Sequence, residues 1–254
     1  MREGQPSGTA QRVAAYRLGF ARLPAPSGDP AADDRLARDV AGGLVFEPSE
    51  RMSRRLEART AFFDRAVVGA LADGIRQVLA IGAGYDGRAL RYARPGVRWF
   101  EVDHPATQAD KQARLARLGI AAPHVTFIGA DLRQAGLAAA LAVSGLRPDG
   151  ASLMLCEGVA VYLDEPVLGA LLGELRAAAG EGSRLEVSFA TELQTAAGSA
   201  RRARFEAGVR ALGEPARNAL TAAGADGLLT GAGWRAMAQP EQTRQAGFIL
   251  ARPA

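Results

Sequence analysis

The sequence predicts a doubly wound α/β fold, in which a mostly parallel sheet carries helices on both faces. Three observations lead to this prediction. From about residue 75 onward, short apolar segments rich in Val, Ile and Leu alternate with segments of helical periodicity. The first apolar segment leads directly into the glycine-rich turn Gly82–Gly87. The chain has 254 residues, enough for one such domain, and no Ser/Pro-rich linker divides it.

The composition excludes several classes of protein. Hydrophobic residues make up 48% of the chain and charged residues 23%, as in ordinary globular proteins. No apolar run reaches the roughly 18 residues of a membrane span, and Met1–Thr9 has no apolar segment of a secretory signal. One cysteine and two histidines predict neither a disulfide nor a metal site. We therefore expect a cytoplasmic protein without membrane contact.

The net charge of +4 raises the alternative of nucleic-acid binding. However, Lys111 is the only lysine, and the arginines are scattered along a chain rich in Ala and Gly. This pattern is typical of a biased genome rather than of a basic patch. Nucleic acid is not expected as a partner.

The first 74 residues are predicted to form a helical cap. We expect a helix over 9–23 with Thr9 as N-cap. A second short helix is expected to begin at Asp33 or Asp34, either of which can cap it, and to end at Gly42–Gly43. A longer helix is expected from about Ser49 to Asp73. The apolar residues of its buried stripe are Met52, Leu56, Phe63, Val67 and Ala70.

Arg59 falls on this apolar stripe of the third helix, between Leu56 and Phe63. An arginine that faces a core is costly unless it meets an anion. Either its long stem reaches water or its guanidinium binds an anion. Both readings stay open at this point.

The cofactor-binding core is predicted to span 75–190, with alternating strands and helices. The expected strands are 76–81, 98–103, 124–129, 152–156 and 184–189. The expected helices are 87–92, 105–118, 134–143 and 165–179.

The rest of the chain follows a different pattern. Residues 191–232 are predicted to form a helical insert with helices at 199–212 and 216–231. Residues 233–254 contain two short apolar segments, 233–238 and 246–251, that can pair as an antiparallel hairpin at the sheet edge. The whole chain, 1–254, is expected to be a single domain.

Polar residues stand at the carboxyl ends of the predicted strands, where open α/β sheets bind their ligands. Asp103 follows the glycine turn by about 20 residues, the place of a carboxylate that accepts hydrogen bonds from ribose hydroxyls. Glu101 lies on the same face of this strand but further from its carboxyl end, so Asp103 is preferred for this role. Asp131 can accept from an exocyclic amine such as adenine N6, and the Leu132 backbone can donate to a ring nitrogen. With Glu157, these residues favour an adenosine ligand.

NAD and S-adenosylmethionine both contain adenosine. Acidic strand ends leave few cations for a pyrophosphate and suit a sulfonium. The Tyr-x-x-x-Lys pair of short-chain dehydrogenases is absent, since Pro166 stands four residues after Tyr162. Five parallel strands followed by an antiparallel hairpin describe the Rossmann-like, seven-stranded class I methyltransferase sheet. These features favour S-adenosylmethionine, and an NAD-dependent oxidoreductase is the alternative.

Several motifs together resemble the bacterial branch of the leucine carboxyl methyltransferase-like family. They occur in the order and spacing of that family, and they cover most of the chain. The motifs are Arg59–Asp64, Gly82–Asp86, Glu101–Pro105, Ala130–Leu132 and Glu157–Tyr162. Gly87 stands where the family usually has threonine, so we expect a looser loop and regard this third glycine as incidental.

The resemblance implies S-adenosylmethionine as cofactor and methylation of oxygen, often of a carboxylate. It places Arg59 at the methionine or the substrate carboxylate, Glu157 near the amino end of the cofactor, and Tyr162 near the acceptor. The expected catalytic residues are Arg59, Tyr162 and His104. The expected cofactor-binding residues are Arg59, Gly82, Ala83, Gly84, Asp103, His104, Asp131, Leu132, Glu157 and Gly158.

A carboxylate acceptor is ionised at neutral pH and needs no general base, whereas a phenol usually needs one. His104 is the only histidine beside the predicted site, and Cys156 is expected to be buried and inert. We therefore expect an S-adenosylmethionine-dependent O-methyltransferase acting on a small-molecule carboxylate or hydroxyl, such as a secondary metabolite. A cofactor-binding protein without methyl transfer is a further alternative. The oligomeric state stays open, with a homodimer as one alternative.

Overall fold

The computed structural model describes residues 4–191 and 196–254 and contains one seven-stranded sheet of order β3-β2-β1-β4-β5-β7-β6. Strands β1 to β5 are parallel, and β7 is antiparallel to both β5 and β6. The predicted sheet and its terminal hairpin are confirmed. The strands are β1 Gln77–Ile81, β2 Arg98–Asp103, β3 Val125–Gly129, β4 Ser152–Cys156, β5 Arg184–Ser188, β6 Trp234–Ala236 and β7 Phe248–Pro253.

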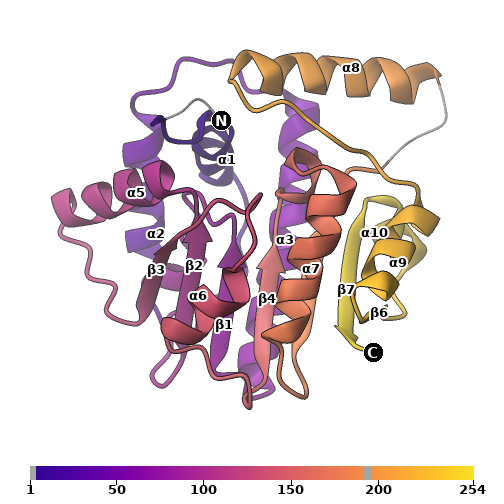
Figure 1. Ribbon diagram of the computed structural model, residues 1–254. Coiled ribbons are helices and arrows are strands. Elements are labelled where there is room, and N and C mark those ends of the chain that lie inside the picture. The colour runs from indigo at the N-terminus through magenta and orange to yellow at the C-terminus, as the bar shows by residue number, and fades with distance from the viewer. Residues whose placement is uncertain (1–3, 192–195) are drawn as a thin grey trace.

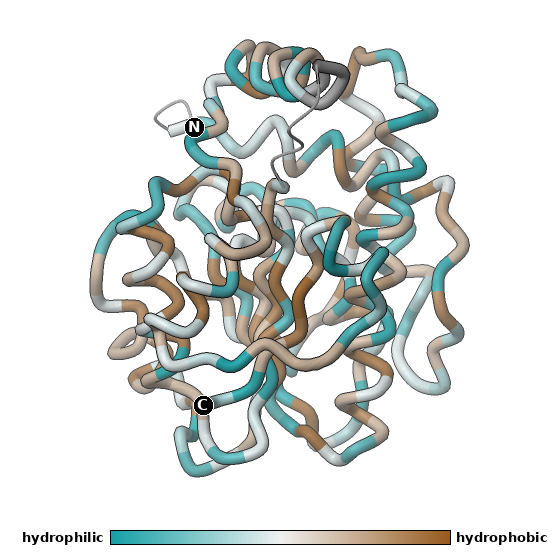
Figure 2. Tube along the Cα trace, turned by 90° about the vertical axis from the view of Figure 1, so that its right-hand side faces the viewer, coloured by the Kyte–Doolittle hydropathy of each residue, from teal (hydrophilic) through white to brown (hydrophobic). Residues whose placement is uncertain are grey.

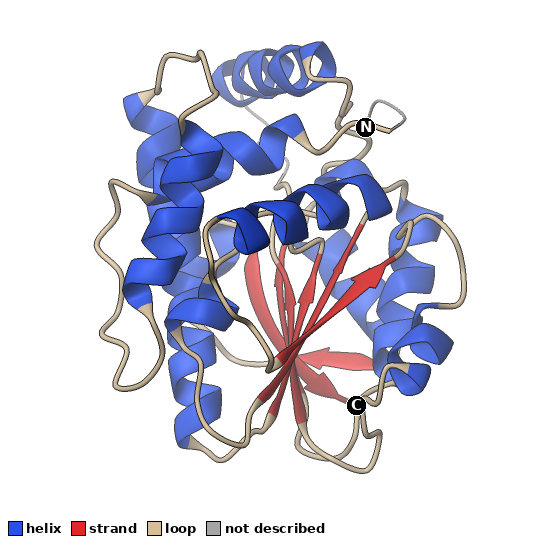
Figure 3. Ribbon diagram, turned by 90° about the vertical axis from the view of Figure 1, so that its left-hand side faces the viewer, coloured by secondary structure: helices blue, strands red, loops and turns tan. Residues whose placement is uncertain are grey.

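Helices cover both faces of the twisted sheet (Figure 3). One face packs against α6, α7 and α9, and the other packs against α3 and α4. The helices are α1 Gly8–Arg17, α2 Pro30–Ala41, α3 Glu50–Ala72, α4 Arg88–Arg91, α5 Pro105–Arg117, α6 Leu137–Val143, the 3-10 helix η1 Ala160–Tyr162, α7 Glu165–Ala177, α8 Ala196–Ala211, α9 Ala222–Gly231 and α10 Glu241–Gln245.

Successive residues of β1 face opposite sides of the sheet. Leu79 and Ile81 lie in the core beneath α7, while Val78 packs against Phe63 and Val67 of α3. Both sides of the strand are therefore apolar, which explains the continuous apolar run in its sequence. In Figure 2 the hydrophobic segments gather in the strands at the centre of the molecule.

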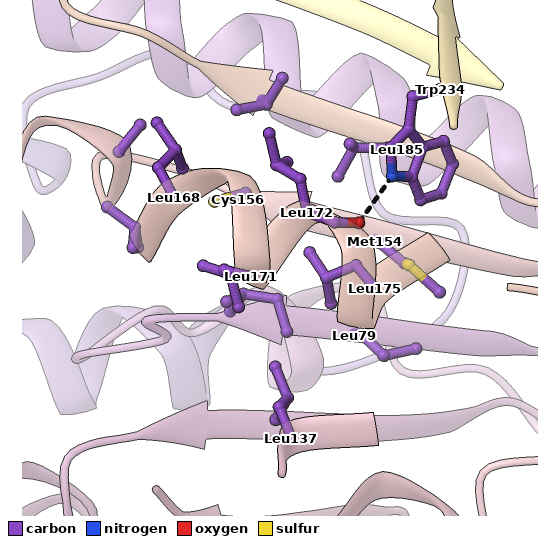
Figure 4. Close-up of a cluster of buried hydrophobic side chains, with 14 of the residues drawn as sticks. Leu79, Leu137, Met154, Cys156, Leu168, Leu171, Leu172, Leu175, Leu185 and Trp234 are labelled. Atoms are coloured by element: carbon purple, nitrogen blue, oxygen red, sulfur yellow. Dashed lines mark hydrogen bonds between the residues drawn. The ribbon is translucent and has the colours of Figure 1, made fainter. Parts of the chain in front are cut away.

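Helix α7 joins the parallel part of the sheet to the terminal hairpin (Figure 4). Its buried leucines lie at helical spacing over the sheet, at positions 168, 171, 172 and 175. Trp234 of β6 is fully buried, and its indole Nε1 donates to the carbonyl oxygen of Leu172 at 2.9 Å. This bond satisfies the one polar atom of the indole, which would be costly to bury alone.

The first two helices begin earlier than predicted, because other residues cap them. Ser7 rather than Thr9 is the N-cap of α1, and its hydroxyl accepts from the backbone N–H of Ala10. Asp29 caps α2 in the same way, with Pro30 in the first turn. Asp33, which was predicted as a cap, lies inside α2 and is buried.

Two predicted helices differ in length from those observed. Helix α1 ends at Arg17, well before the predicted end at Leu23, and α9 begins at Ala222 rather than at residue 216. Residues 214–220 instead form an extended connection, in which the side-chain nitrogen of Asn218 donates to the carbonyl oxygen of Ala160 at 2.8 Å. The part of the predicted 191–232 insert over 192–195 lies outside the described residues.

Helix α3 is the longest helix, with 23 residues, and Ser49 caps it as predicted. It buries one face against the sheet and exposes charged residues on the other, so it is amphipathic. Among the residues that the structure describes, no helix is long and apolar enough to cross a membrane. The start of α3, together with α1 and α8, lies above the carboxyl ends of the strands (Figure 1).

Candidate functional site

A cavity of about 1310 Å³ lies at the carboxyl ends of the strands. Its floor is formed by the loops that follow β1 to β5, and its walls and roof are formed by α1, α3 and α8. Single ligand pockets usually measure about 300–1,000 Å³. The cavity therefore has room for two ligands at once.

The glycine turn after β1 borders this cavity. Gly82 and Gly84 have φ angles of +64° and +51°, a region that other residues rarely adopt. A Cβ on Gly82 would lie 2.2 Å from Cγ2 of Val159, and one on Gly84 would lie 2.7 Å from Cβ of Ala10. The two glycines are thus required by close packing of the turn between the β4 loop and α1, as well as by the backbone conformation.

Asp103 ends β2 beside the glycine turn and lines the cavity. Its Oδ2 accepts from the backbone N–H of Gly84 at 2.6 Å, and its Oδ1 accepts from the N–H of His104 at 2.7 Å. Burial raises the pKa of the carboxyl, while these two N–H donors oppose the shift. Each oxygen keeps a further lone pair for a ligand hydroxyl.

Glu101, the other acidic residue of β2, is not available to a ligand. It is buried, and its Oε2 accepts from Lys111 Nζ at 2.5 Å. The same Nζ donates to the carbonyl oxygen of Asp86 at 2.6 Å. The only lysine of the chain therefore joins α5 to the glycine turn, and Asp103 is the carboxylate of β2 that faces the cavity.

His104 lines the cavity and is the N-cap of α5. Its Nδ1 accepts from the backbone N–H of Ala106 at 3.3 Å. In the neutral ring this bond occupies the lone pair of Nδ1 and leaves the proton on Nε2. The structure thus gives His104 a helix-capping contact, and its catalytic role stays a prediction.

Asp131 and Leu132 follow β3 and both line the cavity. Arg133 donates to Asp131 through Nε at 2.9 Å and through Nη2 at 2.6 Å, which lowers the pKa of the carboxyl. An adenine amine would therefore share this carboxylate with Arg133. Leu132 packs against the core beneath α6 and α7.

Glu157 follows β4 and is the centre of a buried ionic cluster. Its Oε1 accepts from Arg17 Nη2 and from Arg59 Nε, each at 2.9 Å, and its Oε2 accepts from Arg88 Nη1 at 2.6 Å. Burial by itself would raise the pKa of Glu157, but the three arginines outweigh it and hold the pKa well below its usual range. Glu157 is therefore ionised at neutral pH.

The cluster continues below the glycine turn. Arg88 donates to Asp64 through Nε at 2.7 Å and to Asp86 through Nη1 at 2.6 Å. Arg22 also donates to Asp64, at 2.6 Å. Burial opposes ionisation of Asp64, but Arg88 and Arg22 lower its pKa to about 2. These ion pairs join the N-terminal segment, α3 and α4 beneath the cavity.

Sequence reasoning missed this cluster because its arginines are far apart along the chain. Arg17 and Arg22 precede the core, and Arg88 follows the glycine turn. These arginines are scattered along the sequence, but the fold brings them together around buried carboxylates. The one local signal was Asp86 two residues before Arg88, since Asp86 Oδ1 accepts from the Arg88 N–H at 2.9 Å.

The guanidinium of Arg59 binds an anion, which is the second of the two alternatives that the sequence left open. The anion is the carboxylate of Glu157. The outer end of its guanidinium lies against Gly158, where a Cβ would be 3.0 Å from Arg59 Nη1. Gly158 has a φ of +71°. Both residues line the cavity, so a ligand in this part of the cavity would lie beside the outer guanidinium nitrogens of Arg59. Contact with a carboxylate of the cofactor or of the substrate stays a prediction.

Tyr162 ends η1 and lines the cavity together with Thr9 and Glu214. Burial raises the pKa of its phenol; Glu214 adds to the shift and Thr9 opposes it. The phenol is therefore neutral and can donate a hydrogen bond. Glu214 in turn caps α1, because its Oε1 accepts from the N–H of Gly8 at 2.8 Å.

Gly87 is not among the residues that line the cavity, which agrees with the expectation that it is incidental to the ligand. The expectation that it loosens the loop is wrong. A Cβ on Gly87 would lie 1.8 Å from Oδ1 of Asp33. Asp33 Oδ2 in turn accepts from Arg91 Nε at 2.5 Å and from Arg22 Nη1 at 3.3 Å. A threonine at this position would displace Asp33, so Gly87 tightens the loop instead of loosening it.

The remaining candidates for chemistry are structural. Cys156 is buried at the end of β4, and burial raises the pKa of its thiol to about 12. His124 lies before β3, and its Nε2 is 2.7 Å from the carbonyl oxygen of Ala89. Within residues 4–191 and 196–254, no group of three His, Cys, Asp or Glu side chains is placed to hold a metal ion.

The sheet order and the cavity at the strand ends define the class of protein: the class I methyltransferase fold. The family model described as leucine carboxyl methyltransferase matches residues 25–176, more than half of the chain. A protein of Parafrankia sp. is 36% identical over 156 residues, which cover 60% of this chain and 50% of that protein. Its name assigns it provisionally as an S-adenosyl-L-methionine-dependent methyltransferase.

Two solved structures share the fold. A provisionally assigned methyltransferase from Thermobifida fusca aligns with a TM-score of 0.62 at 16% identity, and the match covers 99% of this chain and 96% of that one. The magnesium protoporphyrin IX methyltransferase of Synechocystis, crystallised with bound S-adenosylhomocysteine, aligns with a TM-score of 0.55 at 16% identity, covering 83% and 90%.

The chain belongs to the leucine carboxyl methyltransferase family of class I S-adenosylmethionine-dependent methyltransferases. Its cofactor is therefore S-adenosylmethionine rather than NAD. The chain spans about half the length of several curated relatives that it matches.

Proposed function

We propose that the protein is an O-methyltransferase that transfers a methyl group to a small-molecule carboxylate or hydroxyl, such as a secondary metabolite. The distribution of charge in the cavity carries this proposal. The acids Asp103, Asp131 and Glu157 lie at the strand ends, which we call the cofactor half. Arginines of α1, α3 and α8 that do not contact Glu157 line the opposite part, the acceptor half: Arg12, Arg51, Arg55, Arg202 and Arg204.

The cofactor half fits S-adenosylmethionine. Two backbone N–H groups hold the carboxylate oxygens of Asp103 in place. Each oxygen keeps a lone pair that can accept from a ribose hydroxyl. Arg59 is fixed by Glu157 at one edge, so its outer nitrogens can bind a carboxylate. Gly82 and Ala83 line the same part. The bound cofactor supplies a methyl group on a positively charged sulfur.

The chain's own residues then contribute position and exclusion of water. A well-held pair of reactants gains about 7–11 kcal/mol over free encounter. Among the described residues that line the cavity, His104 is the only histidine, and it lies beside Asp103. The acceptor half thus has no histidine base, and a carboxylate acceptor requires none. This favours a carboxylate over a phenol.

Thermal shift with S-adenosylhomocysteine and with NADH tests the cofactor, because a ligand of the folded state raises the melting temperature. We expect a rise with S-adenosylhomocysteine only. Transfer of labelled methyl groups to a panel of aromatic and aliphatic acids and phenols then tests the reaction. Binding without any methylated product over the whole panel would indicate a cofactor-binding protein instead.

Asp103→Ala is expected to weaken S-adenosylhomocysteine binding by about tenfold or more, since it removes charged hydrogen-bond acceptors of the ribose. Isothermal titration calorimetry measures the loss. Asp73→Ala is the matched control, because Asp73 pairs with Arg184 away from the cavity. Equal affinities of Asp103→Ala and the parent protein would show that the ribose assignment is wrong.

A further inference from the structure

A row of arginines on one face of α3 runs from the cofactor half into the acceptor half. Arg51, Arg55 and Arg59 are spaced four residues apart, and all three line the cavity. Like charges at this spacing on a helix repel each other and destabilise it. An anion bound beside such a row offsets this repulsion and is attracted by it.

For Arg59, the innermost of the three, the offsetting anion is Glu157. Arg51 is exposed at the other end of the row and forms no ion pair with any described residue. Eight residues of α-helix span about 12 Å. The row thus leads from the cofactor half to the mouth of the cavity, and the positive charge of Arg51 at its outer end has no ion-pair partner among the residues that the structure describes.

The wall beside this row is aromatic and apolar. Tyr16 of α1 packs edge-on against Phe46, with 5.4 Å between ring centroids, and the Arg12 guanidinium lies over the same Phe46 ring at 5.7 Å. Met52 and Phe205 also line this part of the cavity. These surfaces fit the body of an unsaturated or aromatic molecule.

Of the three described acids that line the acceptor half, two have partners within the protein, and the third, Glu47, is outnumbered by the arginines at positions 12, 51, 55, 202 and 204. Glu206 pairs with Arg202 of α8 at 2.5 Å, and Glu214 caps α1. The net charge presented to an acceptor at the mouth is therefore positive. A cationic or neutral end of a substrate would find no complementary group at Arg51, whereas an anionic end would.

We propose that the acceptor is an elongated molecule with an apolar, aromatic body and a second anionic group. The group that receives the methyl lies at the Arg59 end, and the second anionic group binds Arg51 and Arg55 at the mouth. This inference rests on the proposed methyl transfer and specifies its substrate class. A carboxylate or a phosphate supplies the same anionic oxygens.

Binding of rigid probes to the protein saturated with S-adenosylhomocysteine tests the proposal by calorimetry. The probes are a biphenyl with a carboxylate at both para ends, one with a phosphonate at one end, and one whose second end is a neutral hydroxymethyl group. We expect both doubly anionic probes to bind about tenfold more tightly than the hydroxymethyl probe, because a charged hydrogen bond is worth that much. A preference between the first two identifies the anion as carboxylate or phosphate.

The variant Arg51→Gln/Arg55→Gln is expected to reduce this tenfold preference to less than about twofold. Arg54→Gln is the control, because Arg54 lies on the same helix, pairs with exposed Glu50 at 2.6 Å and does not line the cavity. The control should keep the preference. Added salt should weaken it in the parent protein, because the site is exposed.

The outcomes separate this inference from the proposed function. If S-adenosylhomocysteine does not bind the parent protein, the proposed function is wrong and the inference with it. If it binds and the three probes have equal affinity, only the second anionic group is wrong. An equal loss of preference in Arg54→Gln would trace the effect to overall charge and overturn the assignment to the mouth.

Discussion

Two buried glutamates on neighbouring strands have opposite electrostatic states. Glu157, at the end of β4, is surrounded by three arginines, and its pKa is held far below the usual range. Glu186, within β5, is only 4% exposed, and its Oε2 has no hydrogen-bond partner among the described residues. Burial raises its pKa to about 8, and the positive charge of Arg184 opposes this shift. Burial alone therefore does not decide the charge; the partners do.

The positions of these two residues explain the difference. Glu157 stands where the strand ends, within reach of α1, α3 and α4. Glu186 pairs in the sheet with Leu155 and Leu250 and faces the side covered by α3. The first carboxylate organises the ligand cavity, while the second is a buried acid that is neutral at pH 7.

The largest expected effect comes from removing the central arginine. Arg88→Ala leaves Asp64, Asp86 and Glu157 with fewer partners, and breaking a buried ion pair in this way costs about 3–5 kcal/mol. Urea unfolding measures the loss. Arg54→Ala, on the exposed face of α3, should cost less than about 1 kcal/mol. Similar losses in both variants would show that the buried cluster contributes no more than a surface pair.

The raised pKa of Glu186 predicts that the free energy of unfolding depends on pH. Its folded pKa of about 8 lies above the ordinary value of 4.5, so the folded protein keeps a proton that the unfolded chain loses. The free energy of unfolding should fall by up to about 1.4 kcal/mol per pH unit between these two values as pH rises. Glu186→Gln should remove this slope. Equal slopes for both proteins in urea unfolding from pH 5 to 9 would mean that Glu186 is ionised.

Gly87→Ala tests how tightly the ionic cluster is packed. The new methyl group would overlap the Asp33 carboxylate that holds Arg91 and Arg22, with an expected cost of about 1–3 kcal/mol. Gly173→Ala in α7 is the control, because nothing lies within 4 Å of its Cβ position; it should be neutral or stabilising. A loss in the control as large as in Gly87→Ala would contradict the steric explanation.

The smallest effect is expected at the rim of the cavity. Arg133→Gln removes an exposed ion pair with Asp131 and should change stability by less than about 1 kcal/mol. It should strengthen S-adenosylhomocysteine binding slightly, because Asp131 no longer divides its oxygens between Arg133 and the adenine amine. Weaker binding would instead indicate that Arg133 itself contacts the cofactor.

Local patterns in the sequence were sufficient for most of the fold. Strands 98–103 and 152–156 have the predicted bounds, and the terminal hairpin pairs as expected. These elements depend on apolar periodicity and turn residues that lie close together in the chain. The ends of α1 and α2 were wrong because several polar residues in sequence compete as caps, and only contacts elsewhere decide among them.

Local sequence patterns thus predicted the class of fold and the acids at the strand ends, Asp103, Asp131 and Glu157, since a parallel sheet brings those positions to one edge. The partners of these acids depend on how the chain folds in space. Arg17 and Arg88 meet Glu157 across 140 and 69 residues of sequence, and Gly87 is required by Asp33 of another helix. Charge pairing and steric fit act through space, and chain spacing alone does not encode them.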